Sequence, residues 1–554
     1  MRHPGSTPVL PRDPSRRSFL RAGALAGATT ALSPSLLAAD SGPCSAAPAT
    51  VSAFEFDEIT VDELQRRMQA GELTAHTIAE RYLARIAAID KAGPLLNSVI
   101  ELNPDALAIA DELDRERKAR GPRGLLHGIP VLIKDNIDTA DRMSTTAGSL
   151  ALVGAKPSRD SFVAHKLREA GAIILGKTNC SEWANIRSSH STSGWSGRGG
   201  LTRNPYALDR NPCGSSSGSG AGISANLAVL AVGTETDGSI VCPSSLNGVV
   251  GIKPTVGLVS RSGIIPISHT QDTAGPMCRT VRDAALLLGA LASVDPNDAV
   301  TAASAGKSPA DYTQFLDPKS ARGMRIGVVR KFFGFHERVD PLIEGSLDVL
   351  RKLGTTLVDP AEIETFPHLF DHELDILLYE LKADLNAYLA RLGPDAPVHT
   401  LREVIAFNEH NHDRELTYFG QDLFLKAEEK GPLTSKDYTD KLAEHLRRAR
   451  AEGIDATMNK LKLDALVAPT APPAFLTDLI NGDAMSGGSS GAAAIAGYPS
   501  ITVPAGFLSG LPVGISFFGR AWSEPTLLKI AYAFEQETKV REPPRFLPGI
   551  GASV

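Results

Sequence analysis

Residues 129–136 read Ile-Pro-Val-Leu-Ile-Lys-Asp-Asn, an apolar run that ends on a lysine, an aspartate and an asparagine. The run is short. His127-Gly128 precedes it and polar residues follow it, a pattern that predicts a buried β-strand. A strand without a polar face is buried on both sides, as in a parallel sheet that helices cover. Lys134 therefore lies at the carboxyl end of a buried strand, where α/β folds place their ligands.

The chain on both sides of this strand alternates between short apolar runs and segments with helical periodicity. A helix at 161–170 leads into a strand at 172–175, and earlier helices are expected after Thr60, after Thr74 and from Asn103 to Arg120. The other expected elements are strands at 227–232, 324–329, 356–358, 465–467, 500–503 and 513–517, and helices at 282–292 and 342–353. This alternation predicts an α/β fold, with a single large domain whose central mixed, mostly parallel β-sheet is covered by helices.

The composition fits a soluble protein with one large core. The chain has 554 residues, of which 42% are hydrophobic and 22% are charged. Its net charge of −6 argues against a general nucleic-acid binder, and its five cysteines are too few for a disulfide scaffold. No linker interrupts residues 54–554, which we assign to one domain. Residues 365–460 are charged and helical, and we expect a helical insertion over the core there.

The amino-terminal residues resemble a targeting signal rather than part of the fold. Residues 15–21 read Ser-Arg-Arg-Ser-Phe-Leu-Arg, and a weakly apolar stretch at 22–39 follows, as in a bacterial twin-arginine export signal. We expect a signal at 1–39, a flexible leader at 40–53 and a periplasmic or secreted mature protein without membrane association. A disordered basic tail is the alternative. Because this pathway carries proteins that are already folded, the cysteines need not be paired despite that destination, and the sequence leaves their redox state open.

Gly171–Thr178 matches the nucleotide-binding P-loop pattern letter for letter. A P-loop wraps a phosphate with exposed backbone amides, but the intervening residues here are Ala-Ile-Ile-Leu. We interpret the segment as a strand that ends at a glycine turn, and a nucleotide-binding protein remains an alternative function.

Gly214–Gly218 fits the G-x-S-x-G nucleophile elbow, with Ser216 at its centre. That elbow requires a strand before it and aspartate and histidine partners after it. The preceding Asn211-Pro212-Cys213 is not strand-like. No downstream histidine, His269 included, has neighbouring residues that indicate a catalytic role. An α/β-hydrolase is therefore a second alternative.

The remaining histidines do not indicate a catalytic site or a metal site. His127 precedes the lysine strand and is interpreted as a turn histidine. His410 and His412 lie in a polar helical stretch, which favours a solvated helix face over a zinc site. We expect no metal.

What remains is a serine- and glycine-rich tract with one lysine upstream. The tract runs from Gly214 to Gly220, and after the apolar residues 227–232 it continues as Gly-Thr-Glu-Thr-Asp-Gly-Ser at 233–239. A surface loop of low complexity is the alternative, but ordered apolar sequence follows each half. Serine with lysine, and without a competent histidine, indicates Ser–Lys acyl-transfer chemistry.

At these residues the chain resembles the amidase signature family. The likeness is carried by residues 124–136, 214–254, 268–277 and 496–504, and so covers nearly the whole mature chain. Within the family it looks closest to bacterial peptide amidases, which remove the amide nitrogen from C-terminally amidated peptides. The closer likeness lies in Gly-Lys-Thr-Asn-Cys-Ser-Glu-Trp-Ala-Asn at 176–185 and Gly-Thr-Glu-Thr-Asp-Gly-Ser-Ile-Val-Cys-Pro at 233–243.

The resemblance implies a catalytic triad of Lys134, Ser215 and Ser239, in which Ser239 is the nucleophile and Ser215, held by a cis peptide, bridges it to the lysine. It also implies an oxyanion hole made by the backbone amides of Thr236, Asp237, Gly238 and Ser239. Many members carry a second glycine where this chain has Asp237, which leaves the exact geometry of the hole open.

The implied chemistry needs no metal or organic cofactor. A lysine that acts as a base near neutral pH needs its pKa depressed by about 3 units, which costs roughly 4–5 kcal/mol of burial and neighbour effects. The apolar run before Lys134 offers part of that burial, whereas Asp135 would oppose it if it were close. We expect hydrolysis of peptide amides, and the alternative is the glutaminase subunit of a tRNA-dependent amidotransferase. The sequence leaves the preferred acyl group, peptide length and oligomeric state open.

Overall fold

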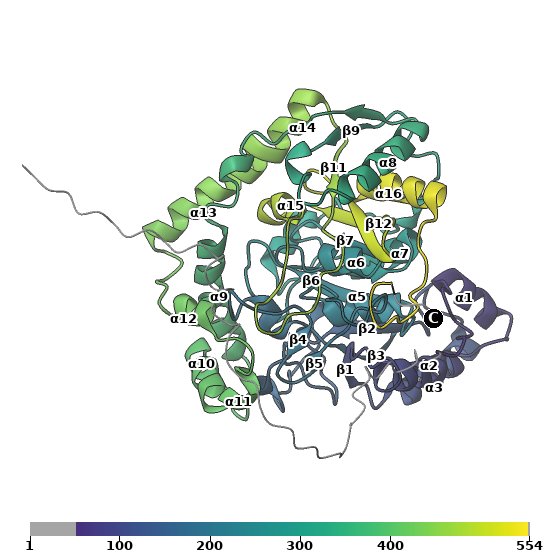
Figure 1. Ribbon diagram of the computed structural model, residues 1–554. Coiled ribbons are helices and arrows are strands. Elements are labelled where there is room, and N and C mark those ends of the chain that lie inside the picture. The colour runs from purple at the N-terminus through teal and green to yellow at the C-terminus, as the bar shows by residue number, and fades with distance from the viewer. Residues whose placement is uncertain (1–50, 552–554) are drawn as a thin grey trace, which may run out of the picture. The chain divides into compact units, whose positions relative to one another are not determined.

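The apolar run around Pro130 forms the predicted strand, β2 (Pro130–Lys134), in which every residue is buried. Figure 1 shows the computed structural model, which describes residues 51–551. The expected export signal at 1–39 and the leader up to residue 50 lie outside the described residues. The described part belongs to one compact unit, in which strands and helices alternate along the chain.

The central sheet has 11 strands in the order β1-β3-β2-β6-β8-β7-β12-β13-β11-β9-β10. β2 lies between β3 and β6, so Lys134 comes from the interior of the sheet. The strands are β1 (Val99–Leu102), β2, β3 (Ile173–Thr178), β6 (Leu230–Glu235), β7 (Val250–Lys253), β8 (Thr273–Cys278), β9 (Arg325–Val328), β10 (Thr356–Val358), β11 (Ala465–Pro469), β12 (Ser500–Leu508) and β13 (Leu511–Phe518). A separate two-stranded ribbon joins β4 (Trp195–Ser196) to β5 (Gly200–Leu201).

The sheet is mixed, as predicted, but the expectation that it is mostly parallel is wrong. Parallel pairing is confined to β3-β2-β6 and β11-β9-β10, and the other neighbours are antiparallel. One cause is the tight turn between β12 and β13, where Ser509 and Gly510 both have positive φ. Such a two-residue turn forces its strands to run in opposite directions. The other cause is β8, which runs antiparallel between β6 and β7.

Helices cover the sheet. The helices are α1 (Val61–Gln69), α2 (Ala75–Arg85), α3 (Ala106–Arg120), α4 (Phe162–Glu169), α5 (Ser217–Ser224), α6 (Val241–Leu246), α7 (Val281–Leu291), α8 (Val339–Lys352), α9 (Glu373–Leu389), α10 (Leu401–His410), α11 (His412–Glu415), α12 (Asp422–Glu428), α13 (Lys436–Ala449), α14 (Asp455–Leu461), α15 (Ser490–Ala496) and α16 (Glu524–Thr538). Among those described, no helix combines the length and apolar character needed to cross a membrane. α3 begins at Ala106, two residues after the expected Asn103-Pro104 start; Asn103 Oδ1 accepts from Asp105 N–H at 2.9 Å, while its amide donates to Ile174 O at 2.8 Å.

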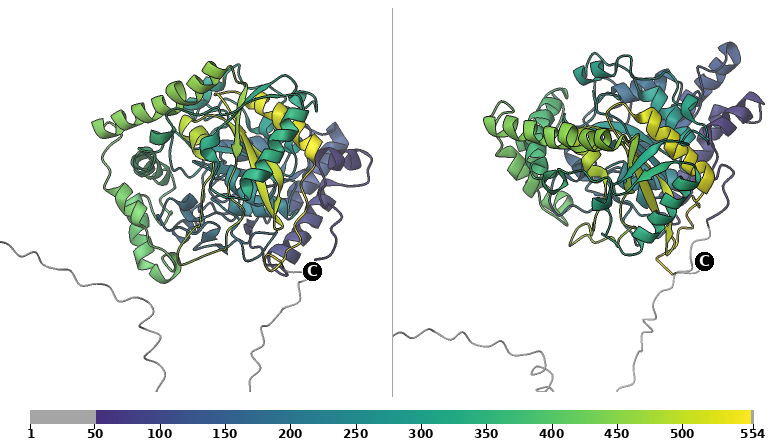
Figure 2. Two further views of the ribbon diagram at one scale, coloured as in Figure 1. Left: turned by 45° about the horizontal axis from the view of Figure 1, so that its top comes forward. Right: turned by 90° about the horizontal axis from the view of Figure 1, so that it is seen from above.

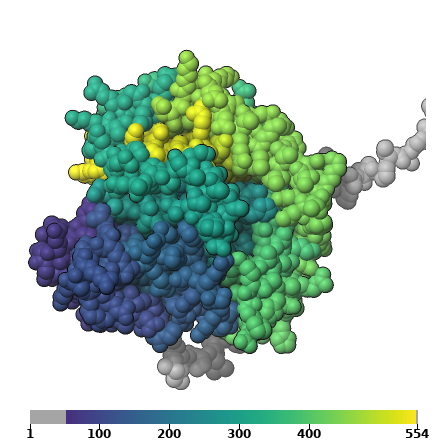
Figure 3. Space-filling view, turned by 180° about the vertical axis from the view of Figure 1, so that it is seen from behind, coloured from purple at the N-terminus to yellow at the C-terminus, as the bar shows by residue number. Residues whose placement is uncertain are grey.

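Residues 365–460 are helical, as predicted, and α9 to α13 gather on one side of the sheet, away from α1 to α3 (Figure 2). Figure 3 shows this segment in green, forming one flank of the visible face. Its apolar side chains do not form an isolated core. Leu381, Leu385 and Phe424 share a buried cluster with Leu152 and Trp183 of the main fold. The helical segment is thereby fixed to the loops that follow β2 and β3.

Candidate active site

Lys134 ends β2 with its side chain fully buried. Its Nζ donates to Ser215 Oγ at 2.7 Å and to Thr234 Oγ1 at 2.8 Å. Burial lowers the pKa of Lys134 to about 8, although the charges of Cys180, Asp272 and Glu235 oppose this shift. A lysine at this pKa is partly neutral near pH 8 and can accept a proton.

Asp135 does not oppose the lysine, although it is the next residue in the chain. Its carboxylate accepts from Gly148 N–H at 3.0 Å and from Arg198 at 3.3 Å, and it also accepts from Thr146 Oγ1. These contacts turn the acid away from Lys134. The sequence-based concern that Asp135 would hold the lysine protonated therefore does not apply to this fold.

Ser215 follows a cis peptide bond between Gly214 and Ser215 and is fully buried. Its carbonyl accepts from Ser181 N–H at 3.1 Å, which ties the segment to the loop after β3. The glycine before it is required by packing, because a Cβ at Gly214 would lie 2.2 Å from Ser181 Oγ. The chain then enters α5, so Ser215 stands at the junction of a loop and a helix.

Ser239 lies in the turn between β6 and α6, with 9% of the residue exposed. Its carbonyl accepts from Ser216 N–H at 3.2 Å, which brings the segments of the two serines into direct backbone contact. The structure therefore brings the segments that carry Lys134, Ser215 and Ser239 together. Among the side chains of these three residues, the described chain shows one hydrogen bond, from Lys134 to Ser215, and none between the hydroxyls of Ser215 and Ser239.

The backbone between β6 and Ser239 is free to bind an anion. Within residues 51–551, none of the amides of residues 236–239 donates a hydrogen bond. The next two amides, of Ile240 and Val241, donate to Glu235 Oε2 at 2.7 and 3.0 Å. Gly238 has a φ of +78°, a conformation that favours glycine. The four amides of residues 236–239 thus remain available for a developing oxyanion.

Several side chains that contact the loop at 236–239 hold it in place, and no motif in the sequence indicated their role. Thr236 Oγ1 donates to Asp272 Oδ1 at 2.6 Å, and Gln271 Nε2 donates both to Thr236 O at 3.3 Å and to Glu373 Oε1 at 3.0 Å. The Glu373 carboxyl also meets that of Asp237, and burial together with the charge of Asp237 raises the pKa of Glu373. Only the resemblance at 268–277 pointed toward part of this group.

Two cavities lie beside the segments that carry the serines and the lysine, although none of these three residues lines either cavity. One, of about 350 Å³, is lined by Asn136 and Thr234 beside the lysine, by Thr236 of the loop, and by Tyr388 of α9. The other, of about 200 Å³, is lined by Gly214 and Gly238, each of which precedes one of the serines. The site therefore has room for substrate groups on both sides of the serine segments.

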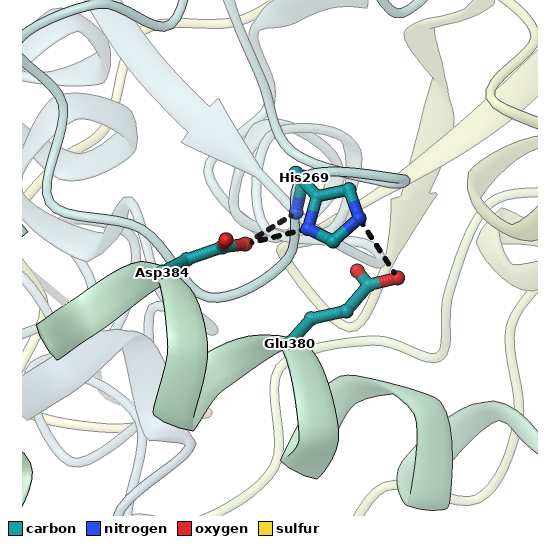
Figure 4. A group of neighbouring side chains, drawn as sticks. All are labelled: His269, Glu380 and Asp384. Atoms are coloured by element: carbon teal, nitrogen blue, oxygen red, sulfur yellow. Dashed lines mark hydrogen bonds and ion pairs between the residues drawn. The ribbon is translucent and has the colours of Figure 1, made fainter. Parts of the chain in front are cut away.

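A charged cluster links the first cavity to the helical segment (Figure 4). His269 Nδ1 bonds to Asp384 Oδ2 at 2.9 Å, and its Nε2 lies 3.6 Å from Glu380 Oε1. Burial would lower the pKa of His269, but the Asp384 hydrogen bond and the charge of Glu380 outweigh it and raise the pKa. These groups lie close enough to hold a metal ion, but a protonated His269 pairs with both acids, and the hydroxyls of Ser268, Thr270 and Tyr438 also donate to Glu380. We interpret the cluster as an ion-pair clamp between the loop at 268–272 and α9.

The segments that match the P-loop and nucleophile-elbow patterns, and His127, have structural roles. The segment at 171–178 contains the buried strand β3, as predicted, but the expected glycine turn at its end is wrong, because Gly176 pairs with β1 and the strand continues to Thr178. Ser216 of the apparent elbow is buried, and its Oγ donates to Thr234 O at 3.0 Å. His127 is the predicted turn histidine: its Nε2 lies 2.9 Å from Leu113 O, and its Nδ1 accepts from Arg123 N–H at 3.3 Å.

The redox state of the cysteines, which the sequence left open, differs among them. Cys213 and Cys242 form a disulfide, with their Cα atoms 6.1 Å apart. They meet because the segments that carry Ser215 and Ser239 adjoin. Cys180 and Cys278 are free and buried, and Cys44 lies outside the described residues.

Comparison with known proteins agrees with this geometry. A family model described as Amidase matches residues 77–528. A probable amidase of Arabidopsis thaliana is 42% identical over 90% of this chain and 93% of its own length. A glutamyl-tRNA(Gln) amidotransferase subunit of Gloeothece citriformis is 36% identical over 88% of this chain and 99% of its own length.

Among solved structures, the native peptide amidase of Stenotrophomonas maltophilia is 51% identical and superposes with a TM-score of 0.85, covering 89% of this chain and 100% of that one. The corresponding amidotransferase subunit of Thermotoga maritima is 27% identical, with a TM-score of 0.66, and covers 90% of this chain and 100% of that one. The family model matches most of the chain, and amidases are found both among its relatives in sequence and among similar solved structures. The chain therefore belongs to the amidase signature family and is an amidase, a hydrolase of amide bonds.

Proposed function

We propose that this amidase releases ammonia from the C-terminal amides of peptides, with Ser239 as nucleophile, Ser215 as bridge and Lys134 as base. The observation that best supports the proposal is the 2.7 Å contact between Lys134 Nζ and Ser215 Oγ, in a chain 51% identical to a peptide amidase. The contact supports the relay, and the likeness supports the substrate class.

The buried position of Lys134 supports its role as a base. Moving its pKa from 10.5 to about 8 corresponds to about 3 kcal/mol of preference for the neutral amine. That is less than the change a base at pH 7 needs, so we expect the enzyme to work best on the alkaline side of neutrality. Thr234 Oγ1, at 2.8 Å from Nζ, and Asn136, which donates to Thr234, hold the amine toward Ser215.

In the acylation step, neutral Lys134 takes the proton of Ser215 while Ser215 takes the proton of Ser239. The Ser239 oxygen then attacks the amide carbonyl, and the proton returns along the relay to the departing ammonia. Water hydrolyses the acyl-enzyme by the same relay in reverse, which restores the serine and releases a free carboxylic acid.

The loop at 236–239 supports the charge that develops on the carbonyl oxygen. Its amides are uncommitted within the described chain, and a preorganised donor of this kind typically contributes roughly 3–4 kcal/mol to the transition state. Asp237 contributes only its backbone N–H, since its carboxyl is engaged by Ser490 and Glu373. The replacement of a family glycine by Asp237 is therefore compatible with an oxyanion hole.

A glutaminase subunit of a tRNA-dependent amidotransferase is the second candidate, because a curated relative of that kind matches 88% of this chain. The solved example superposes less closely than the peptide amidase, with a TM-score of 0.66 against 0.85. We further propose export by the twin-arginine route, which rests on Arg16 and Arg17 in the sequence and which a cytoplasmic amidotransferase would not need.

An ammonia-release assay tests the proposed substrate class. The same enzyme preparation is supplied with a dipeptide amide, the matching free amino-acid amide, a fatty amide and glutamine. We expect the highest kcat/KM on the peptide amide. Highest activity on glutamine, with co-purification of partner subunits and tRNA, would favour the amidotransferase instead.

A further inference from the structure

The Cys213–Cys242 disulfide lies between the two serine segments. Cys213 stands two residues before Ser215, and Cys242 stands three residues after Ser239. The bond spans 29 residues of sequence and closes the loop that contains both serines. Any effect of this bond on catalysis rests on the roles proposed above for Ser215 and Ser239.

The Cys213 end is held in an unfavourable backbone conformation. Its φ is +59°, in the left-handed region that residues with a Cβ rarely adopt. Such a residue persists only where its surroundings hold it. Asn211 Oδ1 accepts from Cys213 N–H at 2.8 Å, and Asn247 Nδ2 donates to Pro212 O at 2.8 Å. The disulfide adds a covalent tether to these two hydrogen bonds.

The Cys242 end is coupled to the proposed oxyanion loop. Cys242 lies in the first turn of α6, and its N–H donates to Gly238 O at 2.8 Å. Gly238 immediately precedes Ser239, so a displacement of Cys242 would displace the loop and the nucleophile together. The position of one half-cystine thus bears on Ser215, and that of the other bears on Ser239.

Noncovalent contacts also join the two serine segments: Ser216 Oγ donates to Thr234 O at 3.0 Å and Asn247 Nδ2 donates to Pro212 O at 2.8 Å, but in the described chain no hydrogen bond joins the hydroxyls of Ser215 and Ser239. Ser216 N–H donates to Ser239 O at 3.2 Å, near the long end of hydrogen-bond distances. Proton transfer between hydroxyl groups needs their oxygens within about 2.6–3.2 Å, and a misplacement of about 1 Å can cost about 100-fold in rate. A covalent tether is suited to keep two segments within this tolerance.

We propose that the Cys213–Cys242 disulfide positions Ser215 against Ser239, so that its reduction lowers kcat while the enzyme stays folded. Cys213 and Cys242 are positioning residues, since they act on the reaction through the serines. In an oxidising compartment the bond persists, whereas in the cytoplasm it would be kept reduced. A chain that remained in the cytoplasm would therefore have low activity.

Both half-cystines are buried, with 5% of each residue exposed, so a small reductant has to reach them through a cavity. Both half-cystines line the cavity of about 200 Å³, together with Met485, which is 44% exposed. A thiolate of a small dithiol attacks one sulfur and forms a mixed disulfide, which releases the other cysteine as a thiolate. The second thiol of the reagent then closes its own disulfide. Two electrons and two protons pass to the cysteine pair, and the dithiol is oxidised.

The first measurement compares the Cys213→Ser/Cys242→Ser variant with Cys278→Ser, which removes a buried free cysteine from β8. Folding is checked by circular dichroism, and kcat and KM are measured on one peptide amide. We expect the double variant to lose at least ~10-fold in kcat with KM within about threefold, and the control to match the wild type. A folded double variant with kcat within about twofold of wild type would overturn the proposal.

The second measurement uses wild-type enzyme and so does not depend on whether the double variant folds. A dithiol is titrated, and alkylation with peptide mass spectrometry follows the state of Cys213 and Cys242. We expect kcat to fall with the fraction of reduced pair and to return on reoxidation, while the double variant does not respond to the reagent. Full activity in enzyme whose pair is shown to be reduced, or a pair found as free thiols in active enzyme, would contradict the proposal.

Ser239→Ala is assayed in parallel. If it is inactive while the folded double variant is fully active, only the role of the disulfide is lost. If Ser239→Ala itself remains active, the proposed triad fails.

Discussion

Lys134 and Ser215 are 81 residues apart in the sequence, yet Lys134 Nζ lies 2.7 Å from Ser215 Oγ in the interior of the protein. The lysine comes from β2 and the serine from the start of the segment that leads into α5. Both side chains are fully buried, so the contact is made without competition from bulk water. This pairing is what distinguishes the site from a histidine-based hydrolase.

The pH dependence of kcat/KM should follow Lys134. Because its neutral form is the proposed base and its pKa is about 8, the rate should fall about tenfold for each pH unit below that value. A pH series of kcat/KM on a peptide amide measures this limb. His127 and His269 lie outside the relay, and a limb controlled by an ordinary histidine near pH 6.5 would argue against the lysine.

The position of this lysine could be anticipated from the sequence, because local information was sufficient. The apolar run at 129–133 has no polar face, so it predicted a buried strand, and Lys134 necessarily followed at its end. The serine tract and the turn before Ser239 were likewise visible as short glycine-rich segments. Their assembly into one site came from the family resemblance and not from periodicity.

β8 could not be predicted in the same way. It reads Thr-Ala-Gly-Pro-Met-Cys, and glycine followed by proline normally indicates a turn. In the fold, Gly275 is needed because a Cβ there would lie 2.0 Å from Ile252 O of the neighbouring β7. That requirement arises from a partner strand elsewhere in the chain. The Cys213–Cys242 pairing was missed for a similar reason, since it depends on tertiary proximity.

A fluorophosphonate should label Ser239. We expect the label there because Ser239 is next to the uncommitted amides, whereas Ser216 Oγ is buried and bonded to Thr234 O. Peptide mass spectrometry locates the adduct, and Lys134→Ala should slow the labelling. Modification of Ser216 would restore the nucleophile-elbow interpretation of Gly214–Gly218.

The clamp between His269 and α9 should stabilise the fold in a pH-dependent manner. The folded pKa of His269 is raised above 6.5, so its stabilisation is present below that pH and is lost as the pH rises through the folded pKa. We therefore expect Asp384→Asn to lower Tm more at about pH 6 than at about pH 9. The matched His269→Gln variant should remove the pH dependence of the Asp384→Asn effect. An equal loss of Tm at both pH values would show that Asp384 acts without a charged His269.

Export predicts a processed amino terminus. If residues 15–21 form a twin-arginine signal, enzyme from the periplasm should begin near Asp40. Changing Arg16 and Arg17 to lysine should leave the precursor in the cytoplasm, as seen by amino-terminal sequencing of fractionated cells. Active enzyme that keeps Met1 and responds to neither substitution would argue against export.

The most direct test of the Ser–Ser–Lys relay is kcat/KM on a peptide amide for Lys134→Ala, Ser215→Ala, their combination and His127→Ala, each checked for folding by circular dichroism. Members of a relay act as a unit, so the two single variants should each lose several powers of ten, and their combination should lose little more. His127→Ala should retain most of its activity, because the His127 imidazole bonds to Leu113 O and Arg123 N–H and, within the described chain, makes no hydrogen bond to Lys134 or to either serine. A folded Lys134→Ala enzyme that keeps most of its activity, or a folded His127→Ala enzyme that loses all of it, would contradict the account.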